Sequence, residues 1–479
     1  MSQEDSMTPV RLNIYNVNRL LTLVLLILTI GTAIYILKLC YTYELSSLRI
    51  ALTGRSNQCS DQDDSTKINS PPTILLSDTK YKSVKHYHSR TLQFSKEFHC
   101  GKLFEADEME QERAMLFTKL HQNQFQTLAE SIVPSMLSDC PAFKEIRGYR
   151  LDSGQQEEEE FPLAYIILVH RDFEHLERLL RALYRPQHTF CIHVDAKASE
   201  HLKKAVSLLV GCFKNMALAS EAHTIIYAHI SRLAADITCM KDLLELDSKW
   251  KYVINYAATE FPLRTNLETV KILKSLNGKN DIHESYKARI KDRFKSEYSV
   301  INGKMTASKV TMAPPPYNLT ITKGQAYNSF TREFVEWVLT EQIPRDFFTW
   351  SEKTYSPDEH YWGTLNNLYH NQFLNTPGGF QGEPDKKGYI TKFISWQYRN
   401  ARHKCQGQII HSICVFSSLD LPTIMVQMHL AANKFDLTYD PIAYACIEEL
   451  HTNKTLANVP LNRAFYKNLH FVKYTVGHK

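Results

Sequence analysis

The sequence predicts an α/β protein built around a mostly parallel sheet, because strand-like and helix-like patterns alternate over residues 163–255. The first pair is a buried-strand pattern at 163–169 (LAYIILV), followed by leucines at helical spacing within 174–184. Similar patterns predict strands at 190–194, 216–219 and 252–255, and helices at 202–210 and 231–246. Alternation of this kind is typical of a parallel sheet with helices on both faces.

Ligands of such sheets bind beyond the carboxyl ends of the strands. The residues that follow the first two predicted strands are His170-Arg171 and Asp195-Ala-Lys197, so these are the first candidates for a binding site. The chain has no G-x-G-x-x-G pattern and no P-loop, which argues against a dinucleotide site and against an ATPase.

An apolar run near the N-terminus predicts the compartment. Residues 20–39 are long enough to span a bilayer, with Arg11 and Arg19 before them and Lys38 at their end. A cleaved signal peptide is the alternative, since Gly31-Thr-Ala33 offers small residues, but the length favours an uncleaved anchor. We therefore predict a cytoplasmic tail (1–19), a transmembrane signal-anchor (20–39), a lumenal stem (40–97) and a lumenal globular domain (98–479).

Two segments of the lumenal part have simple predicted structures. Residues 105–137 have a helical pattern, and the acidic run 155–160 is predicted to be a solvated linker. Asn318-Leu-Thr and Asn453-Lys-Thr are glycosylation acceptors in this topology.

Composition indicates an ordinary folded protein with a real core: 43% of residues are hydrophobic and 22% are charged. The net charge of +5 is too small to indicate a polyanionic partner, and nucleic acid is not expected in the lumen. Ten cysteines are enough for a disulfide-stapled secretory enzyme. No His, Cys, Asp or Glu cluster has metal-ligand spacing outside Asp61-Gln-Asp63 of the stem, so no metal site is predicted.

Four short constellations are candidates for chemistry, and each has a structural alternative. Asp195 ends a strand and could contact a nucleotide or cap a turn. Asp358 and Glu359 lie in an aromatic setting, where burial could raise the pKa of one acid and suit it to act as a base; Ser356 or Asp358 could instead cap a helix. Trp396 and Tyr398 could stack on a sugar or pack in the core, and Lys434 could face a phosphate or water.

Several stretches together resemble the core 2 β-1,6-N-acetylglucosaminyltransferase family (glycosyltransferase family 14). They are LAYIILVHRDFEHLERLLRALYRPQHTFCIHVDAK, CMKDLLELDSKWKYVIN, EFPLRTN, TYSPDEHYW, WQY and ANKFD. The resemblance covers about residues 100–450 in the family order. It implies a GT-A type fold and a Golgi type II membrane enzyme.

The resemblance also implies a disulfide framework. Carried onto matching positions, it pairs Cys100 with Cys446, Cys140 with Cys212, Cys191 with Cys239, and Cys405 with Cys414. Cys59 of the stem and Cys40 at the anchor are then candidates for a disulfide-linked homodimer.

Roles in catalysis follow by the same match. Glu359 would be the general base that removes the proton from the acceptor 6-hydroxyl in a single inverting displacement, with UDP as leaving group. The family uses basic side chains instead of a metal at the diphosphate, so no cofactor is expected. Lys434 matches one of them, and His411 stands where the family has an arginine. Because histidine is only partly cationic at neutral pH, an acid-shifted rate optimum is predicted.

Binding residues are implied for donor and acceptor. Val169, Asp195 and Tyr227 match nucleotide contacts, and Glu284, Lys291, Arg293, Trp396 and Tyr398 match acceptor contacts. The predicted partners are a UDP-sugar, a glycan or glycoprotein acceptor and the Golgi membrane. The leading hypothesis is β-1,6-transfer of N-acetylglucosamine to the 6-hydroxyl of GalNAc in core 1 O-glycans. The alternatives are a glucosyl- or xylosyltransferase with another donor or acceptor, and a catalytically silent glycan-binding homologue.

Overall fold

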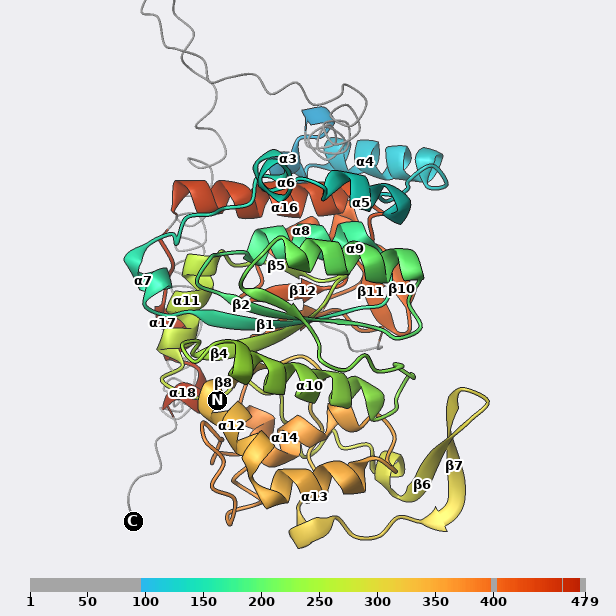
Figure 1. The fold of residues 1–479 in the computed structure, drawn as a ribbon, viewed down its shortest axis with the longest axis vertical. Helices are drawn as coiled ribbons and strands as arrows, with labels where there is room; N and C mark the ends of the chain where they lie inside the picture. Colours follow the sequence, from blue (N-terminus) through green and yellow to red (C-terminus); the bar gives the residue numbers. More distant parts are fainter. Residues whose placement is uncertain (1–95, 398–402, 459, 474–479) are drawn as a thin grey trace, which may run out of the picture. The chain divides into compact units, whose positions relative to one another are not determined.

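The computed structural model describes residues 96–397, 403–458 and 460–473 (Figure 1). Its centre is a five-stranded sheet with the order β3-β2-β1-β4-β8. The strands are β1 (Leu163–Val169), β2 (Thr189–Val194), β3 (Met216–Leu218), β4 (Tyr252–Ala257) and β8 (Ser329–Thr331). The first four are parallel and β8 is antiparallel to β4. The predicted parallel α/β sheet is confirmed.

The register brings two strand ends together. Val169 of β1 lies opposite Val194 of β2, so the segments that follow these strands leave the same edge of the sheet. This is the edge at which ligands of parallel sheets bind.

Helices cover both faces of the sheet (Figure 1). Tyr165 and Ile167 of β1 pack in one core with α8 (Phe173–Leu183) and α9 (Glu200–Gly211). Ala164 and Ile166 pack in a second core with α10 (Ser231–Leu246) and α12 (Arg332–Thr340). Successive strand residues therefore enter opposite cores, which explains why β1 is apolar throughout.

Smaller sheets and further helices complete the described chain. A three-stranded sheet has the order β5-β12-β9, and two hairpins are formed by β6-β7 and β10-β11. Their bounds are β5 (Phe261–Pro262), β6 (Ser296–Ile301), β7 (Lys304–Thr311), β9 (Lys392–Ile394), β10 (Gln408–Ile410), β11 (Ile413–Val415) and β12 (Ala431–Asn433). The remaining α-helices are α3 (Cys100–Phe104), α4 (Glu108–His121), α5 (Val133–Met136), α6 (Cys140–Arg147), α7 (Gln156–Glu159), α11 (Asn266–Ser275), α13 (Gln342–Ser351), α14 (Tyr361–Asn366), α15 (Leu421–Met425), α16 (Pro441–Ala457), α17 (Ala464–Lys467) and α18 (His470–Lys473).

Local sequence explains where the main helices begin. Asp172 accepts hydrogen bonds from the backbone of Glu174 and His175 at the start of α8, and Ser199 accepts one from Leu202 at the start of α9. These are the short polar side chains that satisfy free N–H groups at helix N-termini. The helices predicted at 174–184, 202–210 and 231–246 are confirmed to within about two residues.

Two predictions about local structure need correction. The helical pattern at 105–137 breaks after α4, and helical structure resumes only in a 3-10 helix, Glu130–Ile132, and the short α5, which has Pro134 in its first turn. The prediction of a solvated linker at the acidic run 155–160 is wrong, because the run contains the helix α7. Its Glu158 is buried and lies 3.4 Å from Arg185, and its Glu157 pairs with Lys274.

All four disulfides implied by the family resemblance are formed. They join Cys100 to Cys446, Cys140 to Cys212, Cys191 to Cys239 and Cys405 to Cys414. The first connects α3 to α16 across 346 positions, so it ties the two ends of the described chain together.

The predicted tail, anchor and most of the stem lie outside the described residues, as do Cys40, Cys59 and Tyr398. Within the described ranges, no helix combines the length and hydropathy needed to cross a bilayer. The domain division made from the sequence stays a prediction.

Candidate active site

Asp195 occupies the predicted place at the carboxyl edge of the sheet. Its backbone N–H donates to the carbonyl of Val169 (2.9 Å), which joins the ends of β1 and β2. Its buried carboxylate accepts from the backbone N–H of Lys197 at 2.9 Å and of Ile225 at 3.4 Å. The turn-capping role is therefore real, and the same carboxylate orients the segment that leads to Tyr227.

Three cations and two carboxylates lie at this edge: Arg171, Lys197 and Lys434, with Asp195 and Asp436. Arg171, directly after β1, forms an ion pair with Asp436 at 3.5 Å, and its side chain keeps 62% exposure. Lys434 lies beside them: burial, followed by the charge of Arg171, lowers its pKa, while Asp436 opposes that shift. Burial and the same cations also lower the pKa of His170. Positive charge thus exceeds negative charge here, as an anionic ligand requires.

His411 is at the tip of the β10-β11 hairpin. His411 and Ser412 have φ values of 51° and 64°, the left-handed pair of a two-residue turn between Ile410 and Ile413. The ring of His411 lies 6.0 Å from the ring of Tyr227, and Tyr227 is 74% exposed. Burial and then the charges of Tyr355 and Glu359 raise the pKa of Tyr227, so the tyrosine lies between the hairpin and the carboxylate.

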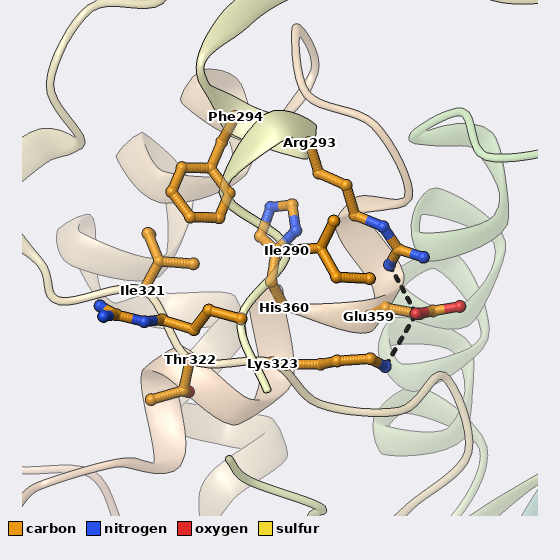
Figure 2. A pocket seen from close by; sticks show the side chains of 9 residues that line it. Ile290, Arg293, Phe294, Ile321, Thr322, Lys323, Glu359 and His360 are labelled. Carbon is orange, nitrogen blue, oxygen red and sulfur yellow. Dashed lines mark hydrogen bonds and ion pairs between the residues drawn. The ribbon is translucent and has the colours of Figure 1, made fainter. Parts of the chain in front are cut away.

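Glu359 ends a short 3-10 helix, Pro357–Glu359, and is held by two cations (Figure 2). Its Oε2 lies 2.5 Å from Nη1 of Arg293 and 3.0 Å from Nζ of Lys323. Burial favours the protonated acid, but the charges of Lys323 and Arg293 outweigh it and lower the pKa of Glu359. A quarter of the side chain remains exposed. Glu359 is thus an accessible carboxylate that is charged at neutral pH.

The neighbouring Asp358 has the opposite environment. It is buried, lies 3.7 Å from Nε of Arg232, and its pKa is raised by burial. Arg232 in turn donates to Asp236 at 3.0 Å and lies over the ring of Tyr327. The acid whose pKa burial raises is therefore Asp358 and not the predicted base. Neither Ser356 nor Asp358 caps α14.

Two glycines fix the position of the Glu359 turn. The N–H of Gly324 donates to the carbonyl of Glu359 at 2.5 Å. A Cβ at Gly324 would lie 3.0 Å from the carbonyl oxygen of His283, and a Cβ at Gly363 would meet the same oxygen and Gly324 itself. A side chain at either position would force these backbones to move apart by a few tenths of an ångström.

We expect Gly324→Ala to displace the Glu359 turn. The added methyl group meets backbone atoms that cannot rotate away, so the variant should lose about 1–3 kcal/mol of stability and most of its activity. Thermal denaturation and the transfer rate measure the two effects. Gly211→Ala is the matched control, because its Cβ would meet no atom within 4 Å. Equal melting of the two variants would show that the close approach is dispensable.

The predicted acceptor residues separate in the structure. Arg293 forms an ion pair with Glu359. Trp396 is half-buried, and its backbone forms an isolated antiparallel β-bridge with Ile413, next to the turn that contains His411. Lys291 is exposed and does not line the pocket of Glu359. Glu284 is buried, hydrogen-bonded to the amides of Asn366 and Asn367, and burial raises its pKa to about 7.

The predicted glycosylation acceptors differ in exposure. Asn318 is exposed on a turn, whereas Asn453 is half-buried within α16. A glycan is therefore easier to attach at Asn318.

Sequence reasoning did not single out Lys323. It precedes Glu359 by 36 positions, and no spacing rule connects them. The lysine reaches the carboxylate because Ser285 and Lys323 form an isolated antiparallel bridge that places it at the pocket.

The described residues contain one set of metal-ligating side chains within reach of one another: Cys405, Cys414 and Asp420. The two cysteines are joined as a disulfide. This set is therefore not a metal centre.

Comparison with known proteins shows which family the chain resembles. Residues 163–425 match the family model described as "Branch: Core-2/I-Branching enzyme". The chain is 34% identical over 387 residues to the Homo sapiens beta-1,3-galactosyl-O-glycosyl-glycoprotein beta-1,6-N-acetylglucosaminyltransferase, covering 79% of this chain and 90% of that protein.

Two other relatives have related names. A Danio rerio beta-1,3-galactosyl-O-glycosyl-glycoprotein beta-1,6-N-acetylglucosaminyltransferase 4 is 36% identical over 336 residues (68% of this chain, 77% of the relative). A Homo sapiens N-acetyllactosaminide beta-1,6-N-acetylglucosaminyl-transferase is 38% identical over 316 residues (64% and 76%). The parallel α/β sheet fits the GT-A type fold, and the family match at residues 163–425 includes Arg171, Asp195 and Glu359. The chain therefore belongs to the Core-2/I-branching enzyme family of glycosyltransferases.

Proposed function

We propose that this chain is an inverting β-1,6-N-acetylglucosaminyltransferase that branches core 1 O-glycans at the 6-hydroxyl of GalNAc. The observation that carries the proposal is Glu359: a partly exposed, charged carboxylate close to Tyr227, whose ring lies 6.0 Å from the ring of His411. The family membership and the names of the relatives support the reaction class.

The proposed reaction is one displacement. The acceptor hydroxyl oxygen attacks the anomeric carbon of the UDP-sugar, the bond from that carbon to the diphosphate oxygen breaks, and the proton of the hydroxyl passes to Glu359. Lys434, Arg171 and His411 would stabilise the charge that develops on the leaving UDP, and Asp195, Val169 and Tyr227 would line its nucleoside. Fixed cations at the position of developing charge are the main source of rate enhancement in such a step.

This scheme assigns no step to a metal ion. Two cations at the diphosphate would supply the neutralisation that a divalent ion supplies in other enzymes. The proposed setting is the Golgi lumen, with residues 20–39 as a type II anchor and Cys59 or Cys40 in a disulfide-linked homodimer.

The test is transfer by the purified full-length protein to a Galβ1-3GalNAc-α-aryl acceptor in excess EDTA. UDP-GlcNAc, UDP-Glc and UDP-Xyl are offered separately. Transfer from UDP-GlcNAc alone is the expected result. Transfer from another donor would support the glucosyl- or xylosyltransferase alternative. UDP binding without transfer from any donor would support the alternative of a catalytically silent glycan-binding homologue.

We expect Arg171→Ala to raise the Kd for UDP about 10-fold, since a hydrogen bond to a charged group contributes about 1.5–3 kcal/mol. Lys434→Ala should weaken binding at least as much, and Arg171→Lys should keep part of the affinity. Isothermal titration calorimetry measures all three. The control is Arg150→Ala, which breaks another exposed Arg–Asp pair outside this cluster. Unchanged affinity in Arg171→Ala would remove this residue from the diphosphate site.

His411→Arg should flatten the pH dependence. Histidine as a residue type is only partly cationic at neutral pH, whereas arginine is charged throughout. The native enzyme is therefore expected to transfer the sugar faster near pH 5.5 than near pH 7.5, and the arginine variant at similar rates. Rates from pH 5.5 to 7.5 for both proteins check this. A flat profile for the native protein would contradict the proposed contact of His411 with the diphosphate.

A further inference from the structure

The hairpin of β6 and β7 projects from the rest of the described chain (Figure 1). The start of β6 is half-buried, whereas every residue of β7 except Met305 is exposed. The strands are joined by Asn302-Gly303, whose φ values of 50° and 74° are typical of a two-residue turn. Residues 296–311 belong to neither of the two hydrophobic cores, so core packing does not explain the presence of this hairpin.

The base of the hairpin is anchored to the residues that hold Glu359. The ring of Tyr298 lies 5.3 Å from the ring of Tyr355, and the hydroxyl of Tyr298 donates to the carbonyl of Asp292 at 3.1 Å. The backbone N–H of Tyr355 donates to the carbonyl of Arg293 at 2.8 Å, and Arg293 forms the ion pair with Glu359. A molecule larger than the sugar that reacts at Glu359 therefore has the hairpin within reach.

Alternation along the strands decides which backbone groups of the hairpin point outwards. Ile301 and Lys304 flank the two-residue turn and form the first pair of the hairpin. In such a hairpin the first pair exchanges hydrogen bonds, and the backbone groups of the next pair, Val300 and Met305, point away from the partner strand. The same alternation places the N–H of Tyr298 on the outer edge of β6.

The outer edge of β6 is covered and that of β7 is open. The N–H of Tyr298 donates to the carbonyl of Lys353 at 2.8 Å, which agrees with its outward direction. The outward backbone groups of β7 belong to Met305 and Ala307. Within the part of the chain that the structure describes, β7 pairs with β6 alone. An unpaired strand edge of this kind can bind another extended chain.

Charge at the open edge restricts the kind of chain that can bind. Lys304 and Lys309 are exposed and flank the uncharged residues 305–308. The only acid of the hairpin sequence, Glu297, pairs with Lys353 at 3.0 Å. Two copies of β7 placed side by side would bring their lysines close together, and like charges on neighbouring strands are destabilising. The complementary partner is therefore a neutral or acidic extended chain and not a second copy of this strand.

We propose that the open edge of β7 binds the polypeptide of the acceptor glycoprotein as an added strand. This inference rests on the proposed function, because a core 1 O-glycan is attached through its GalNAc to a serine or threonine. The 6-hydroxyl that reacts and the carbon that carries the peptide belong to the same ring, so the peptide leaves one sugar ring away from Glu359. Main-chain hydrogen bonds to Met305 and Ala307 then give affinity with little dependence on the peptide sequence.

The experiment compares two acceptors with the full-length protein and saturating UDP-GlcNAc. One is the Galβ1-3GalNAc-α-aryl compound, and the other is a short uncharged glycopeptide that carries the same disaccharide on a central threonine. We expect a KM about 10-fold lower for the glycopeptide, the gain that two main-chain hydrogen bonds supply. Equal KM values for the two acceptors would overturn the inference.

Methylated glycopeptides test for strand pairing in the native protein. Methylation of every second backbone nitrogen is placed in one register or in the other. It should remove the KM advantage in one register only, because alternate N–H groups of an added strand face β7. Loss of the advantage in neither register, or equally in both, would contradict pairing through the strand edge.

A proline variant assigns the effect to β7. Met305→Pro removes an outward N–H and leaves the hydrogen bonds within the hairpin in place. The KM for the glycopeptide should rise to that for the aryl compound, whose own KM should not change. Val300→Pro is the matched control, because Val300 is paired with Met305 and its N–H points to the opposite edge. A glycopeptide preference that survives in Met305→Pro, or is lost equally in Val300→Pro, would overturn the inference.

Binding separates this inference from the proposed function. Saturation-transfer NMR with UDP present reports acceptor binding even if no sugar is transferred. Absence of transfer to both acceptors would reject the proposed function, and tighter, Met305-dependent binding of the glycopeptide in the same samples would still support the peptide-binding edge. Equal binding of the two acceptors would reject the edge. Light scattering covers the other occupant: a dimer that Met305→Pro dissociates, with no effect on the glycopeptide, would show that the edge binds a second copy instead.

Discussion

Glu359→Gln is expected to lower kcat by about 10²–10⁴-fold, the usual contribution of a general base. Glutamine keeps the shape of the side chain but cannot accept the proton of the acceptor hydroxyl. The contact between Oε2 and the cations Arg293 and Lys323 becomes weaker without being removed. UDP binding should persist, because the cations assigned to the diphosphate lie at the end of β1 and beside Asp436.

The pH dependence of this residue has a defined sign. Because Lys323 and Arg293 lower the pKa of Glu359 against the effect of burial, the carboxylate stays charged to a lower pH than an ordinary glutamate. Its contribution to stability is present above the ordinary pKa of glutamate and is lost as the pH falls through the lowered value. Protonation of Glu359 is therefore not expected to lower the transfer rate between pH 5.5 and 7.5.

Single-turnover transfer and UDP titration of the same samples measure the two properties of Glu359→Gln. Glu245→Gln, at an exposed position of α10, is the control for the loss of one carboxylate and should transfer at the native rate. A Glu359→Gln protein that keeps near-native kcat would show that another group accepts the proton.

The sequence predicted the part of the fold that depends on local patterns. Strand β1 and helix α10 have the predicted bounds, because a seven-residue apolar run is short for a helix and a 3.6-residue period over 16 residues is typical of one. The run 155–160 was mispredicted because its charges looked like those of a solvated segment. Arg185 and Lys274, which bind Glu158 and Glu157, are distant in sequence and were not predictable as partners.

The candidate site also has a part that the sequence predicted and a part that it did not. Asp195 and Arg171 follow predicted strands, so the topology alone placed them at the ligand edge. The partners of Glu359 depend instead on a bridge between Ser285 and Lys323 and on the backbone contact of Gly324 with Gly363. Contacts between irregular segments leave no periodic signal in a sequence. This also explains why Glu284 and Lys291 matched the family without lining the pocket of Glu359 in the structure.

Arg232→Leu is expected to have the largest effect on stability. Arg232 pairs with Asp236, which has no exposed surface, and also approaches Asp358. Burial opposes the charge of Arg232, but Asp236, Tyr327 and Asp358 outweigh it and raise the pKa of the guanidinium. Burial raises the pKa of Asp236 to about 6 even with the arginine present. Removing the arginine leaves two buried acids uncompensated, at a cost of about 3–5 kcal/mol.

The same variant should also show that Asp358 acts by positioning its neighbour. Loss of Arg232 frees the Asp358 side chain, and the Pro357–Glu359 turn then loses one of its anchors, so kcat should fall even in molecules that remain folded. Thermal denaturation measures the first effect and kcat at low temperature the second. Arg345→Leu, at an exposed position of α13, should change stability by less than about 0.5 kcal/mol. The double variant Arg232→Leu/Asp236→Leu should recover part of the lost stability, because it removes one uncompensated charge. If the single variant melts like the control, the buried ion pair contributes nothing to the fold. If its kcat is also unchanged, Glu359 is positioned by Arg293, Lys323 and the glycine contacts without help from Asp358.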